Sequence, residues 1–165
     1  GRVAYETPVG FKFIGELINE DKIILGGEES AGLTIKGHFP EKDGILACLL
    51  VVEMVAARGA SLSEMLEELF KKDGALYSER VGIKLTPEVK DRLQKRLSAE
   101  APDTIGGRRV VEVNRMDGVK YIFDDGSWML LRMSGTEPVV RCYAETQSKK
   151  DLEVLLETGS QFVLS

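Results

Sequence analysis

The chain has 165 residues, of which 43% are hydrophobic and 30% charged, and its formal net charge is 22 − 27 = −5. These proportions match ordinary globular proteins and exclude a disordered or fibrous chain. The negative balance opposes broad attraction to nucleic acid or anionic membranes, so any bound anion requires a local site. No apolar run approaches the ~20 residues of a membrane-spanning helix, and no signal-peptide pattern is present. We therefore expect a cytoplasmic protein without nucleic-acid or membrane partners.

The first residues show a strand–helix–strand pattern. It predicts strands at Val3–Tyr5 and Ile23–Leu25, with a helix over Pro8–Asn19 between them. Proline suits a first helical turn, and Thr7 is the candidate cap. Such a βαβ unit favours parallel strands and places ligands beyond the strands' carboxyl ends.

A loop rich in glycine and polar residues follows, with a short strand expected at Leu33–Ile35. The stretch Ile45–Ala57 is so apolar that we expect a helix buried on most sides, which Gly59 ends. Its core stripe is predicted to comprise Leu46, Leu49, Leu50 and Met54. Ser61 and Glu64 form a capping box for a further helix that ends near Lys72.

The pattern changes near residue 76. A strand over "YSERVGIKLT" precedes a helix at Pro87–Ala99, for which Thr86 is the candidate cap. Four strands separated by turn signals and a closing helix at Lys149–Val163 are then predicted; the strands are Arg109–Val113, Lys120–Asp124, Trp128–Met133 and Val139–Glu145. Two modules, 1–75 and 76–165, are therefore expected. The first has few strands for its apolar helices, which suggests that the chain begins inside a domain.

The two cysteines, Cys48 and Cys142, lie far apart within apolar runs. This spacing is unlike that of metal ligands and predicts reduced core thiols. No metal site is expected in this chain.

Two arginines flank a short turn in "LLRMSGTEPVVRCY". If the flanking strands form a hairpin, Arg132 and Arg141 can converge above the turn. Ser134 and Thr136 offer hydroxyl donors, and Gly135 permits close approach of backbone N–H groups to an anion. Because a guanidinium binds phosphate oxygens in pairs, the loop is a candidate phosphate site.

The alternative is that both arginines are solvated hairpin residues. They would then pair with acids such as Glu137 or Glu145, and the Ser-Gly-Thr stretch would only turn the chain. The spacing alone does not decide between the two interpretations.

The loop "RMSGTEPVVRCYAE" resembles the phosphate-binding loop of the α-D-phosphohexomutases, the family of phosphoglucomutase and phosphomannomutase. The stretch "GGEESAG" is similar to the family's sugar-recognition loop, and "TPVGFKFI", "EKDGILA", "TIGGRRVVEV" and "DGSWMLLR" recur in the same order. The resemblance implies an α/β and α+β fold. Residues 1–75 would be the later part of an α/β/α layered third domain, and residues 76–165 a fourth domain with a TATA-box-binding-protein-like antiparallel sheet and helices.

The resemblance also implies a function. Family members interconvert hexose 1-phosphates and 6-phosphates through a phosphoserine and a hexose 1,6-bisphosphate, with Mg²⁺ held by an earlier domain. The serine loop and the metal ligands have no counterpart in this chain. The resemblance therefore assigns no catalytic residue here, and we expect the chain alone to be inactive without its N-terminal domains.

Residue roles carried over from the resemblance fall into two groups. The phosphate-binding group comprises Arg132, Ser134, Gly135, Thr136 and Arg141, and the sugar-binding group comprises Glu28, Ser30 and Lys42. Interpretations without a role in sugar binding stay open for these residues. Glu28 and Glu29 could be a solvated pair or could hold a cation, and Lys42 could balance charge on a surface turn. His38 is expected to be a loop residue rather than a catalyst.

The substrate would be a phosphosugar. Phe11 stands where some family members carry histidine, which favours glucose phosphates, but dual glucose and mannose specificity stays open. A noncatalytic phosphosugar-binding or assembly module is the alternative function.

Overall fold

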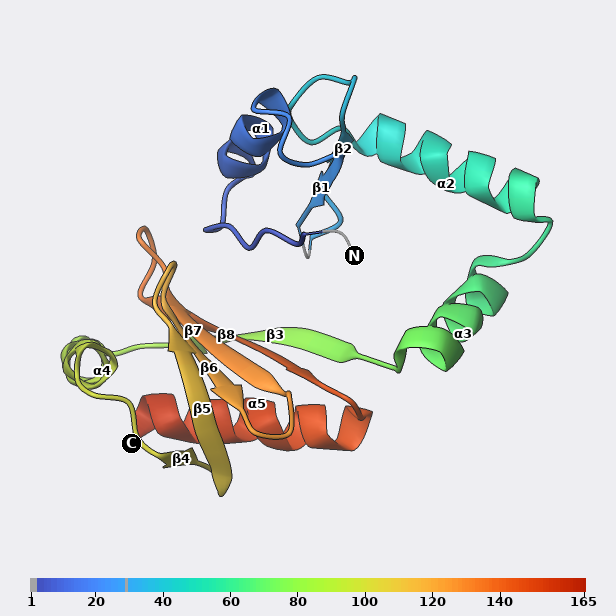
Figure 1. The fold of residues 1–165 in the computed structure, drawn as a ribbon. Coiled ribbons are helices and arrows are strands. Elements are labelled where there is room, and N and C mark those ends of the chain that lie inside the picture. The colour runs from blue at the N-terminus through green and yellow to red at the C-terminus, as the bar shows by residue number, and fades with distance from the viewer. Residues whose placement is uncertain (1–2, 29) are drawn as a thin grey trace. The chain divides into compact units, whose positions relative to one another are not determined.

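The computed structural model describes residues 3–28 and 30–165. The chain forms two compact units, residues 1–68 and 69–165 (Figure 1). Compactness alone does not fix where a domain ends, so the modules expected from the sequence, 1–75 and 76–165, stay a prediction.

The N-terminal unit contains helices and one small sheet. Its strands β1 and β2 pair antiparallel, with Leu25 opposite Ile35. The elements in chain order are α1 (Phe11–Asn19), β1 (Leu25–Gly27), β2 (Leu33–Ile35), α2 (Gly44–Arg58) and α3 (Leu62–Asp73), the last of which continues past the limit of the unit.

The predicted βαβ arrangement is wrong in this unit. Val3–Tyr5 is not a strand, and β1 pairs with the strand that follows it rather than with one that precedes it. A short antiparallel hairpin satisfies backbone groups locally, whereas a parallel pair requires a long crossover. Helix α1 begins at Phe11 instead of Pro8, and its cap is Gly10 without a side-chain hydrogen bond, so Thr7 is not the cap.

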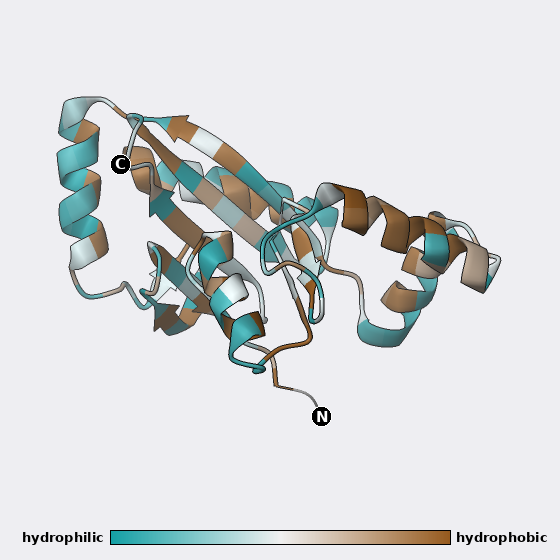
Figure 2. Ribbon diagram, turned by 90° about the horizontal axis from the view of Figure 1, so that it is seen from above, coloured by the Kyte–Doolittle hydropathy of each residue, from teal (hydrophilic) through white to brown (hydrophobic). Residues whose placement is uncertain are grey.

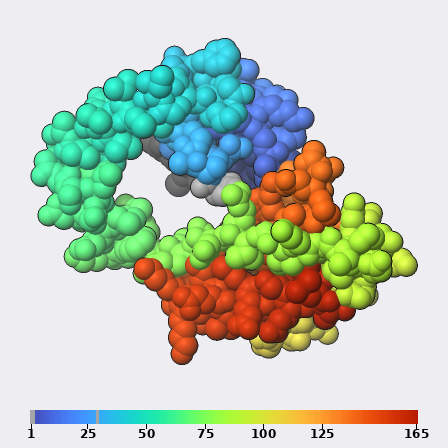
Figure 3. All heavy atoms as spheres, turned by 180° about the vertical axis from the view of Figure 1, so that it is seen from behind, coloured from blue at the N-terminus to red at the C-terminus, as the bar shows by residue number. Residues whose placement is uncertain are grey.

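Helix α2 was expected to be buried, and this prediction is also wrong. It has no buried residue, and Leu49 is 62% exposed. Figure 2 shows α2 hydrophobic along most of its length, and its side chains lie at the surface in Figure 3. Its apolar sequence therefore finds no cover among the described residues. No single described helix is long and apolar enough to cross a membrane, although α2 and α3 pass that test together across an 82° bend.

The C-terminal unit is a six-stranded antiparallel sheet with two helices. The sheet order is β3-β8-β7-β6-β5-β4, which brings the first strand of the unit beside the last. The elements are β3 (Tyr77–Lys84), α4 (Pro87–Ser98), β4 (Thr104–Ile105), β5 (Arg108–Asn114), β6 (Val119–Phe123), β7 (Trp128–Met133), β8 (Val139–Thr146) and α5 (Lys149–Leu164). The mixed α/β and α+β class expected from the sequence is confirmed.

One face of this sheet carries the core. Met129, Leu131, Val140 and Cys142 are fully buried and cluster with residues of α4 and α5 such as Leu155. Helix α5 approaches closely at Gly159, where an added Cβ would lie 2.6 Å from the Cys142 sulfur. The alternate residues of each strand belong to the opposite face of the sheet.

The predicted caps of α3 and α4 are confirmed, unlike that of α1. Thr86 accepts a hydrogen bond from the Val89 N–H and caps α4, as expected. Ser61 and Glu64 exchange the expected capping-box bonds at the start of α3. The cysteine prediction holds only in part, because Cys142 is buried but Cys48 on α2 is exposed.

Candidate functional site

The two arginines of the candidate phosphate loop lie directly opposite each other. Strands β7 and β8 pair in a register that places Arg132 against Arg141. Their neighbours Leu131 and Cys142 are buried against the helices, so both guanidinium groups belong to the opposite face of the sheet. The predicted hairpin is confirmed, and it holds the two charges at the end where the loop begins.

Like charges directly opposite each other in a sheet are unfavourable. Here one acid offsets part of the cost, because Arg132 Nε donates to both carboxylate oxygens of Asp117 at 3.0 Å. Glu145, a partner considered from the sequence, instead accepts from the Trp128 indole at 2.9 Å. Among the described residues, no ion pair joins Arg141 to Glu137 or Glu145. Asp117 therefore compensates Arg132, whereas neither acid considered from the sequence forms an ion pair with Arg141 among the described residues.

The loop between the arginines is held by its own serine. Ser134 Oγ accepts hydrogen bonds from the Thr136 and Glu137 N–H groups at 3.5 and 3.3 Å. Because a hydroxyl can accept and donate at once, its proton remains a donor for an anion. Pro138 O accepts from the Leu85 N–H at 2.8 Å, which ties the loop to the end of β3.

Gly135 and Thr136 are exposed at the tip of this loop. A Cβ on Gly135 would meet nothing within 4 Å, and the residue has no positive φ. Glycine is therefore not needed for the turn itself. Its missing side chain leaves the space above the backbone open to a ligand.

Two residues of the candidate sugar group lie close together in the N-terminal unit. The hairpin between β1 and β2 closes when the Glu28 N–H donates to Gly32 O at 2.9 Å. A Cβ on Gly32 would lie 3.2 Å from Glu28 Oε2 and 3.4 Å from Lys42 Cβ, so both side chains border this glycine. Ser30 is exposed in the same turn, and Glu29 lies outside the described residues.

Lys42 has local partners as well. Its Nζ donates to Glu41 Oε1 at 2.7 Å and lies 5.4 Å from the centre of the Phe11 ring. The hydrogen bond to Glu41 raises the pKa of Lys42, and the charge of Glu28 acts in the same direction. Lys42 therefore stays cationic near the Glu28 carboxylate, in a geometry compatible with both its sugar-binding and its surface-turn interpretation.

His38 takes part in a helix cap. Its Nε2 lies 2.9 Å from Asp43 Oδ2, and Asp43 Oδ1 accepts from the Ile45 and Leu46 N–H groups at the start of α2. The Leu46 N–H, followed by the His38 contact, lowers the pKa of Asp43. These contacts fit the expectation of a loop histidine.

The structure thus brings Arg132 and Arg141 together in one unit, and Glu28 and Lys42 in the other. Sequence reasoning missed Asp117. Its signal was the "MDG" turn, which was used only to separate two strands. Within the described part of the chain, no group of three or more His, Cys, Asp or Glu residues could hold a metal ion.

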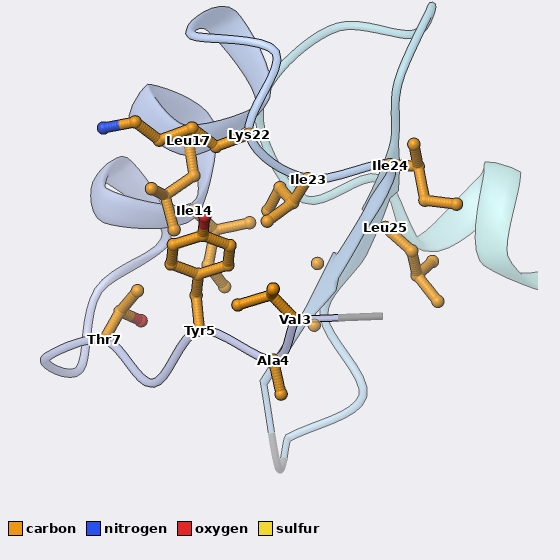
Figure 4. A pocket seen from close by; sticks show the side chains of 12 residues that line it. Val3, Ala4, Tyr5, Thr7, Ile14, Leu17, Lys22, Ile23, Ile24 and Leu25 are labelled. Atoms are coloured by element: carbon orange, nitrogen blue, oxygen red, sulfur yellow. The ribbon is translucent and has the colours of Figure 1, made fainter. Parts of the chain in front are cut away.

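The N-terminal unit also has a cavity of about 810 Å³, which is bordered by residues 3–5, α1 and the segment that enters β1. Figure 4 shows Val3 and Tyr5 pointing toward Ile14 and Ile23, whereas Ile24 and Leu25 point away. The cavity is mainly apolar and none of the predicted site residues lines it, so it is separate from both groups of candidate binding residues.

Comparisons with known proteins cover nearly the whole chain. The family model described as "Phosphoglucomutase/phosphomannomutase, alpha/beta/alpha domain III" matches residues 1–72, and that for the C-terminal domain of the same family matches residues 80–158. A phosphoglucomutase/phosphomannomutase of Thermococcus kodakarensis is 30% identical over 96% of this chain and 32% of its own length. A phosphoglucosamine mutase of Methanococcus maripaludis is 30% identical over 99% of this chain and 34% of its own length.

A solved structure gives the same result for the fold. A protein of Thermus thermophilus, assigned as a phosphomannomutase, is 34% identical with a TM-score of 0.74, over 96% of this chain and 31% of that one. The chain thus spans about a third of the length of the relatives it matches.

Proposed function

Because the chain belongs to the phosphoglucomutase/phosphomannomutase family and carries its domains III and IV, we propose that it is the substrate-binding part of a phosphohexomutase. The complete enzyme would interconvert hexose 1-phosphates and 6-phosphates through a phosphoserine and a hexose 1,6-bisphosphate. This chain would bind the phosphosugar, and the proposed location of the enzyme is the cytoplasm.

The observation that carries the proposal is the direct pairing of Arg132 with Arg141 beside the Ser134–Thr136 turn. Two guanidinium groups match the charge of a phosphate dianion and can bind its oxygens in pairs. A bound dianion would also relieve the repulsion between the two arginines. Held away from the reacting end, this phosphate would orient the sugar, and its binding energy could be used in the transition state.

The sugar hydroxyls would be read by Glu28, Ser30 and Lys42. A carboxylate accepts hydrogen bonds from neighbouring hydroxyls, and a lysine ammonium can donate to a hydroxyl or a phosphate oxygen. The closeness of Glu28 and Lys42 around Gly32 supports one shared role.

We assign the phosphoryl transfer itself to residues outside this chain. The described residues offer no fitting set of ligands for Mg²⁺. We propose that the serine and the metal ligands belong to parts of the longer enzyme outside this chain, and that this chain alone has no mutase activity. Turnover by the purified chain in a coupled assay would refute this part of the proposal.

Removing either arginine should abolish most of the binding. We expect Arg132→Ala and Arg141→Ala each to cost about 2–3 kcal/mol of affinity for glucose 1-phosphate and glucose 6-phosphate. Calorimetry measures the affinity, and thermal unfolding should show an intact fold. Arg109→Ala is the matched control, because it removes the same charge from an exposed position on β5.

We call Arg132 and Arg141 the phosphate clamp. Equal affinity in wild type, Arg132→Ala and Arg141→Ala would refute the phosphate site. Equal weakening by Arg109→Ala would show that net charge, rather than a clamp, attracts the ligand.

A noncatalytic phosphosugar-binding module would use the same clamp. Mass spectrometry of the native polypeptide separates the two functions: a product about three times longer supports the enzyme, as the lengths of the relatives suggest.

A further inference from the structure

The contact between Asp117 and Arg132 joins the turn between two strands of the sheet to a third strand. Asp117 lies in the turn between β5 and β6, and Arg132 lies on β7. Both oxygens of the carboxylate accept from the same Nε, and the two side chains are only 28% and 24% exposed. A contact that is partly shielded from water is screened less than a surface pair, so it can fix a side-chain orientation.

The turn that carries Asp117 is itself fixed in place. Gly118 has a φ of 88°, and a Cβ there would lie 2.5 Å from Leu131 O and 3.1 Å from Arg132 Cα. Only glycine fits so close to the backbone of β7. Asn114 Oδ1 accepts from the Met116 N–H at 2.8 Å, which closes the turn from the other side.

A second arginine anchors this turn to a helix. Arg115 donates through Nη1 to Leu97 O and through Nη2 to Ala99 O, the latter at 2.8 Å, at the carboxyl end of α4. Cations are favoured at that end of a helix. The turn that carries Asp117 is therefore held on one side by the bonds from Arg115 to α4 and on the other by the contact of Gly118 with β7.

We propose that Asp117 is a positioning residue for the phosphate clamp. By accepting from Nε, it fixes the plane of the Arg132 guanidinium and leaves both terminal nitrogens for the phosphate. Among the described residues these two nitrogens have no protein acceptor. The inference rests on the proposed function, because it assigns a task within the same phosphate site.

A purely electrostatic account predicts the opposite effect of neutralising Asp117 on phosphate affinity, so the direction of the change distinguishes the two. A carboxylate beside an anion site should repel the anion, so its neutralisation should strengthen binding if charge were all that mattered. If Asp117 positions Arg132, its neutralisation should weaken binding, because the guanidinium must be ordered when the ligand arrives.

The experiment compares Asp117→Asn with wild type in this chain, by calorimetry with inorganic phosphate and with glucose 6-phosphate. We expect affinity for both ligands to fall about five- to tenfold, since a charged hydrogen bond is replaced by a weaker neutral one. The control is Asp124→Asn, which removes the same charge from an exposed turn at the other end of β6 and should leave affinity within about twofold. Unchanged or tighter binding by Asp117→Asn would overturn the inference.

A double-mutant cycle separates positioning from general structural damage. Lysine has no Nε–H within a planar fork, so in an Arg132→Lys background the Asp117→Asn change should no longer weaken phosphate binding. A loss as large as in the arginine background would show that Asp117 merely supports the fold, and would overturn the inference.

A ligand-free readout keeps the inference separate from the proposed function. In wild type, the Arg132 Nε–H signal in a nitrogen–proton NMR spectrum should be protected from exchange with water, and Asp117→Asn should remove that protection. Absence of protection in wild type would overturn the inference even if phosphate binds. Failure of the proposed function would appear differently, as an Arg132→Ala variant with unchanged phosphate affinity.

Discussion

The two units of this chain differ in how they use apolar sequence. In the C-terminal unit, alternating strands and two helices bury sixteen apolar side chains in one cluster. In the N-terminal unit, the most apolar helix of the chain, α2, buries none, and the large buried apolar side chains among the described residues are Phe11, Ile14 and Ile18 of α1. A hydrophobic sequence shows what needs to be covered, whereas burial requires a partner surface.

This difference bears on the two groups of candidate binding residues, one in each unit. The phosphate clamp stands on central strands of a packed sheet, where neighbouring strands fix β7 and β8 on both sides. The Glu28 loop stands on a hairpin of two three-residue strands. This hairpin packs against α1 but has only two strands, whereas β7 and β8 lie inside a six-stranded sheet, so we expect the Arg132–Arg141 pair to be the better organised of the two groups in this chain.

The largest expected difference between the units is in the rate at which their cysteines react with a thiol reagent. Burial raises the pKa of the Cys142 thiol to about 12, whereas Cys48 is exposed on α2. Because the thiolate is the reactive form, a thiol reagent at neutral pH should label Cys48 quickly and Cys142 at least ~10³-fold more slowly. Mass spectrometry of the labelled protein over time measures both rates. Rapid labelling of both thiols would contradict a closed core in the C-terminal unit.

The same thiol predicts a pH dependence of stability. In the unfolded chain Cys142 would ionise near its ordinary pKa of about 8.5, whereas the folded chain keeps the proton until about pH 12. The unfolded state therefore releases the proton first, and the free energy of unfolding should fall as pH rises above about 8.5. Denaturation in a Cys142→Ala background, where this contribution is absent, is the control.

Truncating a core leucine should separate the units by free energy. Leu131→Ala removes a side chain with no exposed surface and should lower the free energy of unfolding of the C-terminal unit by about 3 kcal/mol. Leu49→Ala makes the same change on α2, where the side chain is 62% exposed, and should cost less than about 0.5 kcal/mol. Urea denaturation measures both values. A cost for Leu49→Ala that approaches that of Leu131→Ala would mean that α2 is covered in solution.

A smaller effect than that of Leu131→Ala is expected for a change in the Glu28 loop. Glu28→Gln should weaken binding of glucose 6-phosphate by about 1 kcal/mol, because an ionised acceptor of hydroxyl hydrogen bonds becomes neutral. Binding of inorganic phosphate, which has no sugar hydroxyls, should change less. Calorimetry with both ligands gives the comparison. Equal weakening would indicate that Glu28 shapes the loop rather than binding the sugar.

The sequence predicted the C-terminal unit better than the N-terminal one, for physical reasons. Alternation and the turns "MDG" and "DDGS" are local signals, so the hairpins and the facing arginines could be anticipated. The pairing of β3 with β8 and the short strand β4 could not, because they depend on contacts between distant segments or on two residues only. The contact of Asp117 with Arg132 was missed for the same reason.

In the N-terminal unit, the local pattern suggested a parallel arrangement that the described residues do not form. Residues 3–5 have strand-like sequence but no strand partner, and α2 has the composition of a core helix without a core around it. The excess of apolar helix over strand had suggested that neighbouring structure is missing, but composition and periodicity did not show which elements would lack a partner.

The most direct test of the phosphate clamp is a crystal structure of this chain with glucose 6-phosphate. The clamp predicts phosphate oxygens within hydrogen-bond distance, about 3 Å, of guanidinium nitrogens from both Arg132 and Arg141, with the Ser134 hydroxyl donating to the same group. A phosphate bound elsewhere, with the two guanidinium groups turned apart into solvent, would contradict it.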